Sequence, residues 1–187
     1  MNARHGEETA MQDLWLLKFR WPAAQAEDPL AALRKRAADA PRVWRAIEGD
    51  AAYAYFATDT PREACDVAPA GASLRRLACM VELPGASHGA EAPFHYVVET
   101  DVVPEHEADF NAWYDQEHLP GLAAVPGTVR AARYVCRDGS PRYHACYDFA
   151  WREAFGSPAW LAVRATDWSS RVRPSFRNTT RTMFRRA

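Results

Sequence analysis

The order of predicted elements recurs in the two halves of the chain, and this recurrence constrains the fold more than any other feature. Short apolar runs predict strands, and segments that follow a proline predict helices between them. The first half is predicted to have strands at 14–19, 43–47, 52–57 and 74–83, and helices at 29–40 and 62–67. The second half is predicted to have strands at 94–103, 129–136, 143–149 and 178–184, and helices at 104–118 and 158–172. Each half therefore runs strand–helix–strand–turn–strand–helix–strand.

Two short sequence matches at equivalent places support a duplication. Ala-Pro-Arg-Val at 40–43 resembles Val-Pro-Gly-Thr-Val at 125–129, where each half passes from a helix to a strand. Pro-Arg-Glu-Ala at 61–64 resembles Trp-Arg-Glu-Ala at 151–154, after each predicted hairpin. Because the matches occur in the same order in both halves, they favour a tandem repeat.

The order β-α-β-β-α-β is that of the ferredoxin-like unit, an antiparallel sheet with helices on one face. The other face is apolar and must be buried, most simply against a second copy. We therefore predict an α+β fold of two tandem ferredoxin-like repeats, with their sheets packed as an α/β barrel. The barrel is expected to close within one chain, or two chains pair as a homodimer. The predicted organisation is a disordered leader at 1–12, repeats at 13–83 and 94–187, and a Gly-, Ala- and Pro-rich linker at 84–93.

Composition excludes several classes of partner. The 187 residues carry a net charge of −1, so no global field favours nucleic acid. No apolar run approaches the roughly 18 residues of a membrane span, and the first residues lack the apolar region of a signal peptide. The four cysteines form no CxxC pair, which indicates buried thiols rather than a zinc site. These features predict a cytoplasmic protein that binds neither membranes nor nucleic acid.

The densest group of reactive side chains lies in the predicted helix at 104–118. Pro104 begins the helix, and Leu119-Pro120-Gly121 is expected to end it. Helical spacing directs Trp113 toward the sheet. The same spacing gathers polar side chains on the adjacent edge, and these are Asn111, Tyr114 and His118. His118 is expected in the last turn, where the helix dipole favours its protonated form and where it meets both pocket and solvent.

This group suits acid–base chemistry. A histidine beside a carboxylate can serve as a general acid or base at neutral pH, so we predict His118 as the catalytic group and Glu117 as the group that orients it. Asn111 or Tyr114 is predicted to bind a substrate oxygen and stabilise enolate charge. The alternative is that Glu117 and His118 only cap the helix and hydrogen-bond the following loop.

Further candidate residues lie on the predicted strands. Arg133 and Tyr134 alternate across one strand and must face opposite sides, and Tyr143 and His144 do the same on the next. These four residues and Trp113 are the predicted substrate-binding set. His144 with Asp148 is a second possible acid–base pair.

Two other groups have an open interpretation. The face formed by Tyr143, Tyr147 and Phe149 is expected to be core, and the tryptophans of the last helical region either pack on the sheet or wall an aromatic pocket. Arginines recur every four residues near the C-terminus, at Arg177, Arg181 and Arg185. They are expected at a solvated sheet edge, or else bind an anionic substrate or partner.

The second half resembles a known family. The pattern E-x-x-F-N-x-W-Y-x-x-E-H-L-P-x-L, from Glu107 to Leu122, is followed by V-P-G, A-x-R-Y and R-Y. This pattern is similar to the EthD-like branch of the dimeric α/β-barrel superfamily over roughly residues 93–187. The first half fits only by its element order and lacks a W-Y-x-x-E-H counterpart, so its pocket is predicted to be degenerate.

The resemblance implies a ligand pocket between the sheet and its helices, with His118 pointing into it. The superfamily includes cofactor-free isomerases, dehydratases, cyclases, quinone-forming monooxygenases and some haem proteins. We therefore predict a cofactor-independent isomerase, dehydratase or related lyase that acts on a small hydrophobic or aromatic carbonyl compound. The alternatives are a cofactor-free monooxygenase, a non-catalytic protein that binds a small ligand or haem, and a purely structural module. No metal site is expected, and no cofactor, although haem would need only one axial histidine.

Overall fold

A computed structural model describes residues 13–21, 28–31, 41–57 and 69–187. The predicted leader at 1–12, the predicted helix at 62–67 and Cys65 lie outside these ranges, as does nearly all of the predicted helix at 29–40. At the start of that helix, Asp28 accepts a hydrogen bond of 2.9 Å from the backbone N–H of Leu30, as an N-cap residue does.

Within the described residues, eight antiparallel strands form a closed barrel in the order β1-β3-β2-β8-β5-β7-β6-β4. The first half contributes β1 (Leu14–Arg20), β2 (Arg42–Ala46), β3 (Ala51–Ala57) and β4 (Ser73–Pro84). The second half contributes β5 (Phe94–Val102), β6 (Thr128–Cys136), β7 (Tyr143–Phe149) and β8 (Phe176–Arg186). Each predicted strand is therefore present, with its ends shifted by up to two residues.

The strand pairing confirms two ferredoxin-like sheets joined edge to edge. In each half the third strand pairs with the second and the first, and the first pairs with the fourth. The halves join where β4 pairs with β6 and where β2 pairs with β8. The barrel thus closes within one chain, which removes exposed strand edges.

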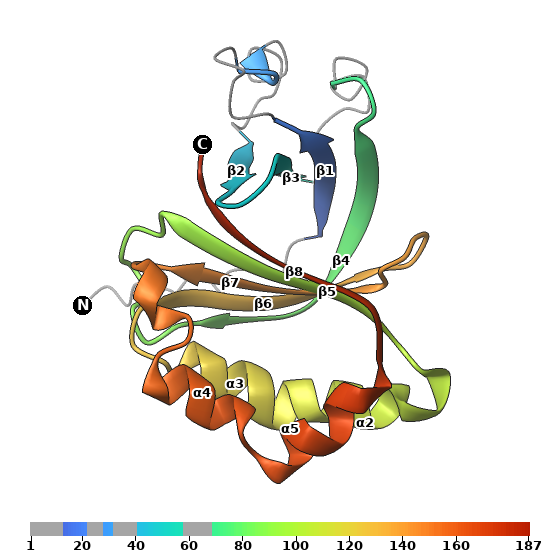
Figure 1. The fold of residues 1–187 in the computed structure, drawn as a ribbon, viewed down its shortest axis with the longest axis vertical. Helices are drawn as coiled ribbons and strands as arrows, with labels where there is room; N and C mark the ends of the chain where they lie inside the picture. The colour runs from blue at the N-terminus through green and yellow to red at the C-terminus, as the bar shows by residue number, and fades with distance from the viewer. Residues whose placement is uncertain (1–12, 22–27, 32–40, 58–68) are drawn as a thin grey trace, which may run out of the picture.

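Helices of the second half cover the outer face of its sheet (Figure 1). After β5 come η2 (Pro104–His106), α2 (Glu107–Trp113), η3 (Tyr114–His118) and α3 (Leu119–Ala123). After β7 come η4 (Arg152–Ala154), α4 (Pro158–Arg164), α5 (Asp167–Val172) and η5 (Arg173–Ser175). The predicted helix at 158–172 is therefore two helices, because the Thr166 side chain accepts from the Ser169 N–H and starts a new N-terminus. No helix among the described residues is long and apolar enough to cross a membrane.

The prediction that the site helix ends at Leu119-Pro120-Gly121 is wrong. The helix continues to Ala123 through η3, a single π turn in which the Leu119 N–H donates to the Tyr114 carbonyl. This wide turn already displaces the usual hydrogen-bond ladder just before Pro120, so the missing N–H of the proline is tolerated. Gly121 permits close packing on α4, because an added Cβ would lie 2.8 Å from the Val163 side chain. The two residues that suggested a stop therefore shape a continuing helix.

The sheet of the second half separates two buried regions. The aromatic face of β7, formed by Tyr143, Tyr147 and Phe149, packs under the helices as predicted. The other face turns into the barrel, where Cys146 packs with residues of both halves. Arg177, Arg181 and Arg185 are exposed as expected, but β8 lies between β2 and β5, so the expected sheet edge is absent.

Candidate functional site

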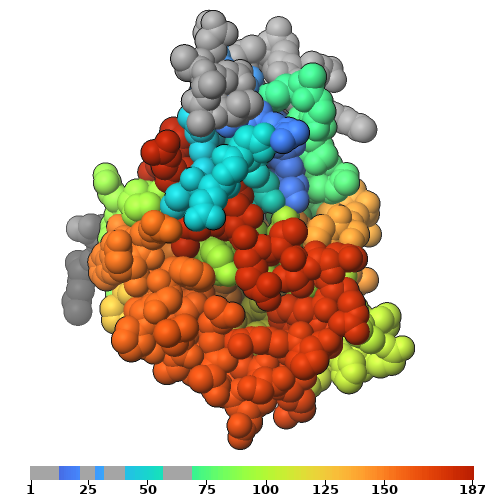
Figure 2. Space-filling model, in the orientation of Figure 1, coloured from blue at the N-terminus to red at the C-terminus, as the bar shows by residue number. Residues whose placement is uncertain are grey.

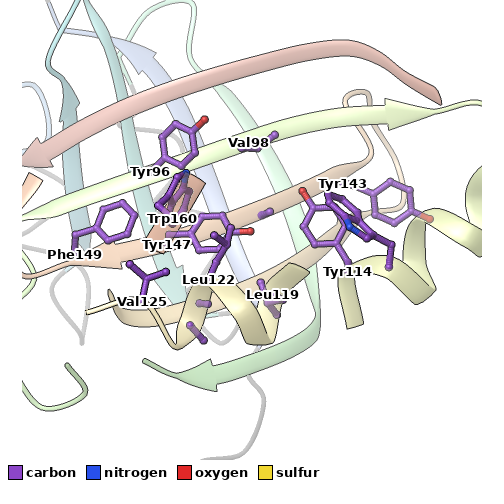
Figure 3. Packing of buried hydrophobic residues seen from close by; sticks show 14 of the residues in the cluster. Tyr96, Val98, Tyr114, Leu119, Leu122, Val125, Tyr143, Tyr147, Phe149 and Trp160 are labelled. Atoms are coloured by element: carbon purple, nitrogen blue, oxygen red, sulfur yellow. The ribbon is translucent and has the colours of Figure 1, made fainter. Parts of the chain in front are cut away.

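A small cavity lies between the outer face of the second sheet and its helices. Tyr96 of β5 and Tyr147 of β7 line it from the sheet, and Tyr114, His118 and Trp160 line it from the helices. Figure 3 shows Tyr96, Tyr147 and Trp160 grouped near Leu122, with Tyr114 farther along the sheet and the Tyr147 hydroxyl directed toward the side on which Tyr114 lies. The volume in which the centre of a water molecule can lie inside this cavity is about 30 Å³. Because about 10–15 Å³ of such space holds one water, the cavity has room for about two or three waters.

His118 is buried in the wall of this cavity and is 7% exposed. Its ring stacks on Trp113 at a centroid distance of 4.0 Å and meets the edge of Tyr114 at 5.3 Å. Burial, together with the charges of Arg173, Arg164 and Arg133, lowers the pKa of His118 to about 3. The prediction of a protonated histidine at a solvated helix end is therefore wrong, because the helix continues past His118 and the sheet covers it. His118 is neutral at pH 7.

Three buried polar atoms around the cavity have no hydrogen-bond partner. They are His118 Nδ1, Tyr147 Oη and Trp160 Nε1. All three residues line the same cavity. Burial raises the pKa of the Tyr147 hydroxyl well above its usual value, so it stays protonated and can donate. Buried polar groups in proteins nearly always have a partner, so this convergence indicates a place for a polar guest.

Glu117 does not contact the His118 ring nitrogens by any hydrogen bond. Its Oε1 atom accepts from Trp113 Nε1 at 3.1 Å and from the Thr166 hydroxyl at 2.6 Å. Consecutive residues of a helix point in different directions, so a direct Glu117–His118 pair is unfavourable. Glu117 instead holds the Trp113 ring on which His118 stacks. Through Thr166 it also links η3 to the start of α5. The helix-cap alternative also fails for His118, because its Nδ1 bonds no following loop.

Three other predicted site residues form a separate cluster beside the cavity. Arg133 is buried and donates to Asn111 Oδ1 at 2.7 Å and to Asp115 Oδ1 at 2.9 Å. Asn111 Nδ2 donates to the Tyr143 hydroxyl at 3.4 Å, and that hydroxyl donates to Glu107. Asn111, Arg133 and Tyr143 therefore bind one another and do not line the cavity. The Arg133 guanidinium lies 4.2 Å from the ring centroid of Tyr114, which does line it.

Tyr134 and His144 lie on the opposite face of the sheet, inside the barrel. The Tyr134 hydroxyl accepts from Arg130 at 3.0 Å. His144 Nδ1 is 3.2 Å from Glu99 Oε1, but neither of its ring nitrogens has hydrogen-bond geometry to a partner. The predicted His144–Asp148 pair is absent, because residues four apart on a strand are separated by roughly 13 Å. Neither Tyr134 nor His144 can contact a ligand that occupies the His118 cavity.

The structure adds residues that were not in the predicted catalytic and substrate-binding set. Tyr96, Tyr147 and Trp160 line the cavity, together with Arg164, Arg173 and Arg181. Strand alternation correctly placed Tyr147 on the same face as Tyr143 and Phe149. That face was expected to be core, so Tyr147 was not predicted to line a cavity. From the sequence, Trp160, among the tryptophans of the last helical region, is a possible pocket wall, and Arg181 is a possible contact for an anion. No spacing rule predicts that either residue lies near His118.

The residues around His118 do not fit a haem. A space of about 30 Å³ cannot enclose a haem, and it admits only the polar end of a smaller organic ligand, because pockets that bury a whole organic ligand have roughly 300–1,000 Å³. Among residues 13–21, 28–31, 41–57 and 69–187, no group of three or more His, Cys, Asp or Glu side chains could hold a metal ion.

Comparisons with known proteins identify the fold. No family model matches the chain, and no curated protein matches its sequence. A predicted monooxygenase from Lactobacillus acidophilus superposes with a TM-score of 0.61 at 12% identity, covering 94% of both chains. An anthrone oxidase-like protein gives 0.58 at 12% identity over 96% of this chain and 92% of its own. The haem-degrading enzyme of Listeria monocytogenes gives 0.61 at 8% identity, covering 93% and 99%. At such identities the likeness shows the ferredoxin-like α/β-barrel fold, and the EthD-like assignment stays a prediction.

Proposed function

We propose that this chain is a cofactor-independent enzyme that removes a proton from a small hydrophobic or aromatic carbonyl compound. The observation that carries the proposal is that three residues lining one cavity each have a buried polar atom without a partner, and these atoms are His118 Nδ1, Tyr147 Oη and Trp160 Nε1. One of these atoms can accept a proton and two can donate hydrogen bonds. That combination suits a carbon acid whose oxygen gains charge when a proton leaves.

Each residue has a distinct role in this proposal. Neutral His118, with its proton on Nε2, accepts the substrate proton at Nδ1. The Tyr147 hydroxyl and the Trp160 indole N–H donate to the enolate oxygen as charge develops there. Trp113 fixes the plane of the His118 ring by stacking, and Glu117 fixes Trp113. Returning the proton from His118 to another carbon gives isomerisation, and transferring it to a β-hydroxyl, which leaves as water, gives dehydration.

A cofactor-free monooxygenase is the second candidate. It shares the first step, after which the carbanion reacts with dioxygen instead of regaining a proton. Two observations favour it: the names of the predicted monooxygenase and the anthrone oxidase-like protein, and a cavity whose size suits a molecule as small as dioxygen. Anthrone is a suitable probe, because deprotonation, uptake of dioxygen and loss of water convert it to anthraquinone.

The test is deuterium exchange at the acidic carbon of 2-tetralone and of anthrone in D₂O, followed by NMR, with dioxygen uptake recorded in parallel. Exchange above the buffer rate is expected, and His118→Ala should lower it by about a hundredfold or more, the usual contribution of a general base. His106→Ala is the matched control, because His106 is exposed in the same helical segment and does not line the cavity. Exchange at the buffer rate for both probes, or equal losses in the two variants, would contradict the proposal. A Soret band on haem titration that His118→Ala abolishes would instead support haem binding.

A further inference from the structure

Three arginines line the His118 cavity from three different elements. They are Arg164 of α4, Arg173 of η5 and Arg181 of β8. Among the described residues, none of the three has a carboxylate within ion-pair distance, whereas eight other ion pairs of arginine or lysine with carboxylates are formed elsewhere. Arg173 donates only to the Arg164 carbonyl at 2.7 Å and to the Ser169 hydroxyl at 3.0 Å. No carboxylate among the described residues therefore forms an ion pair that neutralises the positive charge of these three arginines.

A larger pocket of about 440 Å³ adjoins this cavity. Tyr96, Arg164 and Arg181 line both spaces, so they form the boundary between them. Phe155 and Met183 supply apolar surface in the outer pocket, whereas Arg152 and the exposed Glu48 add one charge of each sign. Figure 2 shows the hollow between the orange segment of η4 and α4 and the red strand β8, with the green of β5 visible at its floor. The volume of this outer pocket lies within the roughly 300–1,000 Å³ that is usual for small-molecule binding sites.

We propose that the substrate is an organic anion, with a carboxylate or similar group bound by Arg164 and Arg181. The hydrophobic body of the molecule lies in the outer pocket, and the carbonyl next to the anionic group reaches the His118 cavity. This proposal deepens the function proposed above and depends on it for the reaction, but not for the binding. Arginine suits the task because its planar guanidinium binds a carboxylate through two parallel hydrogen bonds.

The charges explain why an anion belongs here. Burial and the neighbouring Arg164 and Arg181 lower the pKa of Arg173, so the three guanidinium groups oppose one another. An anion at the boundary relieves this repulsion. Arg173 and Arg164 also make His118 harder to protonate, together with Arg133 from β6. A base is most effective when its pKa is close to the ambient pH, so a bound anion that offsets these charges makes His118 a better base for its own substrate.

Calorimetry with two probes of matched shape tests the binding. 2-Naphthoate carries a carboxylate where neutral 2-acetonaphthone carries an acetyl group. 2-Naphthoate should bind about tenfold or more tightly, as expected for a charge-assisted bidentate contact. Arg181→Gln and Arg164→Gln should each remove about tenfold of the 2-naphthoate affinity and leave 2-acetonaphthone unchanged. Arg185→Gln is the control on β8, because Arg185 is exposed and lines neither space.

Equal affinities for the two probes would overturn the proposal, as would an equal loss in Arg185→Gln and Arg181→Gln. Thermal unfolding of each variant shows whether the fold is kept. The two proposals fail in different ways. If 2-naphthoate binding depends on Arg181 but no deuterium exchange occurs with any probe, the anion site stands and the reaction is wrong. If Arg181→Gln leaves 2-naphthoate binding intact while His118-dependent exchange of 2-tetralone persists, the reaction stands and the anionic substrate is wrong.

Discussion

The barrel interior and the helix-covered face lie on opposite sides of the same strands, and both bury a neutral histidine. In the interior, His95 donates from Nδ1 to Asp148 at 2.5 Å and accepts at Nε2 from the Tyr55 hydroxyl, 3.1 Å away. Burial outweighs the attraction of Asp148 and lowers the pKa of His95. His118 on the other face is also buried, yet its Nδ1 has no partner. The hydrogen bonds of His95 help to hold the barrel together, although His144 in the same interior has no partner at either ring nitrogen. The unpaired Nδ1 of His118 differs because it belongs to a residue that lines a cavity, so it can bond a ligand.

The interior network also joins the two repeats. Glu99 of β5 accepts from Lys18 and Tyr53 of the first half, each at 2.8 Å. Burial opposes the charge of Glu99, but His144 and Lys18 outweigh it and lower the pKa of Glu99 to about 2. Arg130 of β6 pairs with Glu82 of β4 at 2.8 Å. Such polar contacts fix how one half is placed on the other. The polar groups that line the cavity on the helix-covered face all belong to the second half, so they do not have this role.

The largest expected effect follows from removing the central acid of the interior. Asp148→Ala leaves Arg130 and His95 without their shared partner in a buried site, which should lower the free energy of unfolding by about 3–5 kcal/mol. Urea denaturation measures this loss. Asp50→Ala is the control, because it breaks only the exposed ion pair with Arg20 and should shift the urea denaturation midpoint little. A small loss in Asp148→Ala would mean that the interior network contributes no more than a surface pair.

A smaller effect compares the same substitution on the two faces. Tyr55→Phe removes a hydroxyl that bonds His95, and should cost about 1–2 kcal/mol of unfolding free energy. Tyr147→Phe removes a hydroxyl that has no partner, so it should be neutral or slightly stabilising. Urea denaturation of the two variants under identical conditions gives the difference. Equal losses would show that Tyr147 is satisfied in solution, by ordered water for example.

The smallest effect, measured over a single pH unit, concerns acid. The folded pKa of His118 is about 3, below the ordinary value of 6.5, so only the unfolded chain takes up this proton as the pH falls. The stability tied to His118 is therefore full above pH 6.5 and is lost progressively toward pH 3, at most about 1.4 kcal/mol per pH unit. His118→Gln should make unfolding less sensitive to pH between 6 and 5, while the His95 contribution remains in both proteins. Parallel pH profiles for the two proteins would refute a neutral, buried His118.

Periodicity and spacing predicted much of the fold because they depend on local geometry. Alternation correctly placed Arg133 and Tyr134 on opposite faces, and likewise Tyr143 and His144. The chain order of strands and helices predicted two ferredoxin-like units, and strand pairing confirms them. The site prediction was less complete. Of the nine predicted site residues, the cavity is lined by Trp113, Tyr114 and His118.

The misplaced details share a physical cause. The stop at Pro120 was wrong because a π turn, which no simple spacing rule reveals, precedes it. The Glu117–His118 and His144–Asp148 pairs were inferred from closeness in sequence, whereas side-chain direction decides contact. The true partner of Asp148 is His95, 53 residues away along the chain.

The sequence by itself determined the repeat of elements, the faces of each strand and the concentration of reactive groups around His118. These depend on interactions within a few residues. Tertiary structure decided which buried polar atoms are paired, because the partners come from strands far apart in the chain and meet only when the barrel closes. It also brought Arg164, Arg173 and Arg181 to one cavity from separate elements. Whether a buried histidine stabilises the fold or faces a ligand depends on those long-range neighbours, and His95 and His118 differ for that reason.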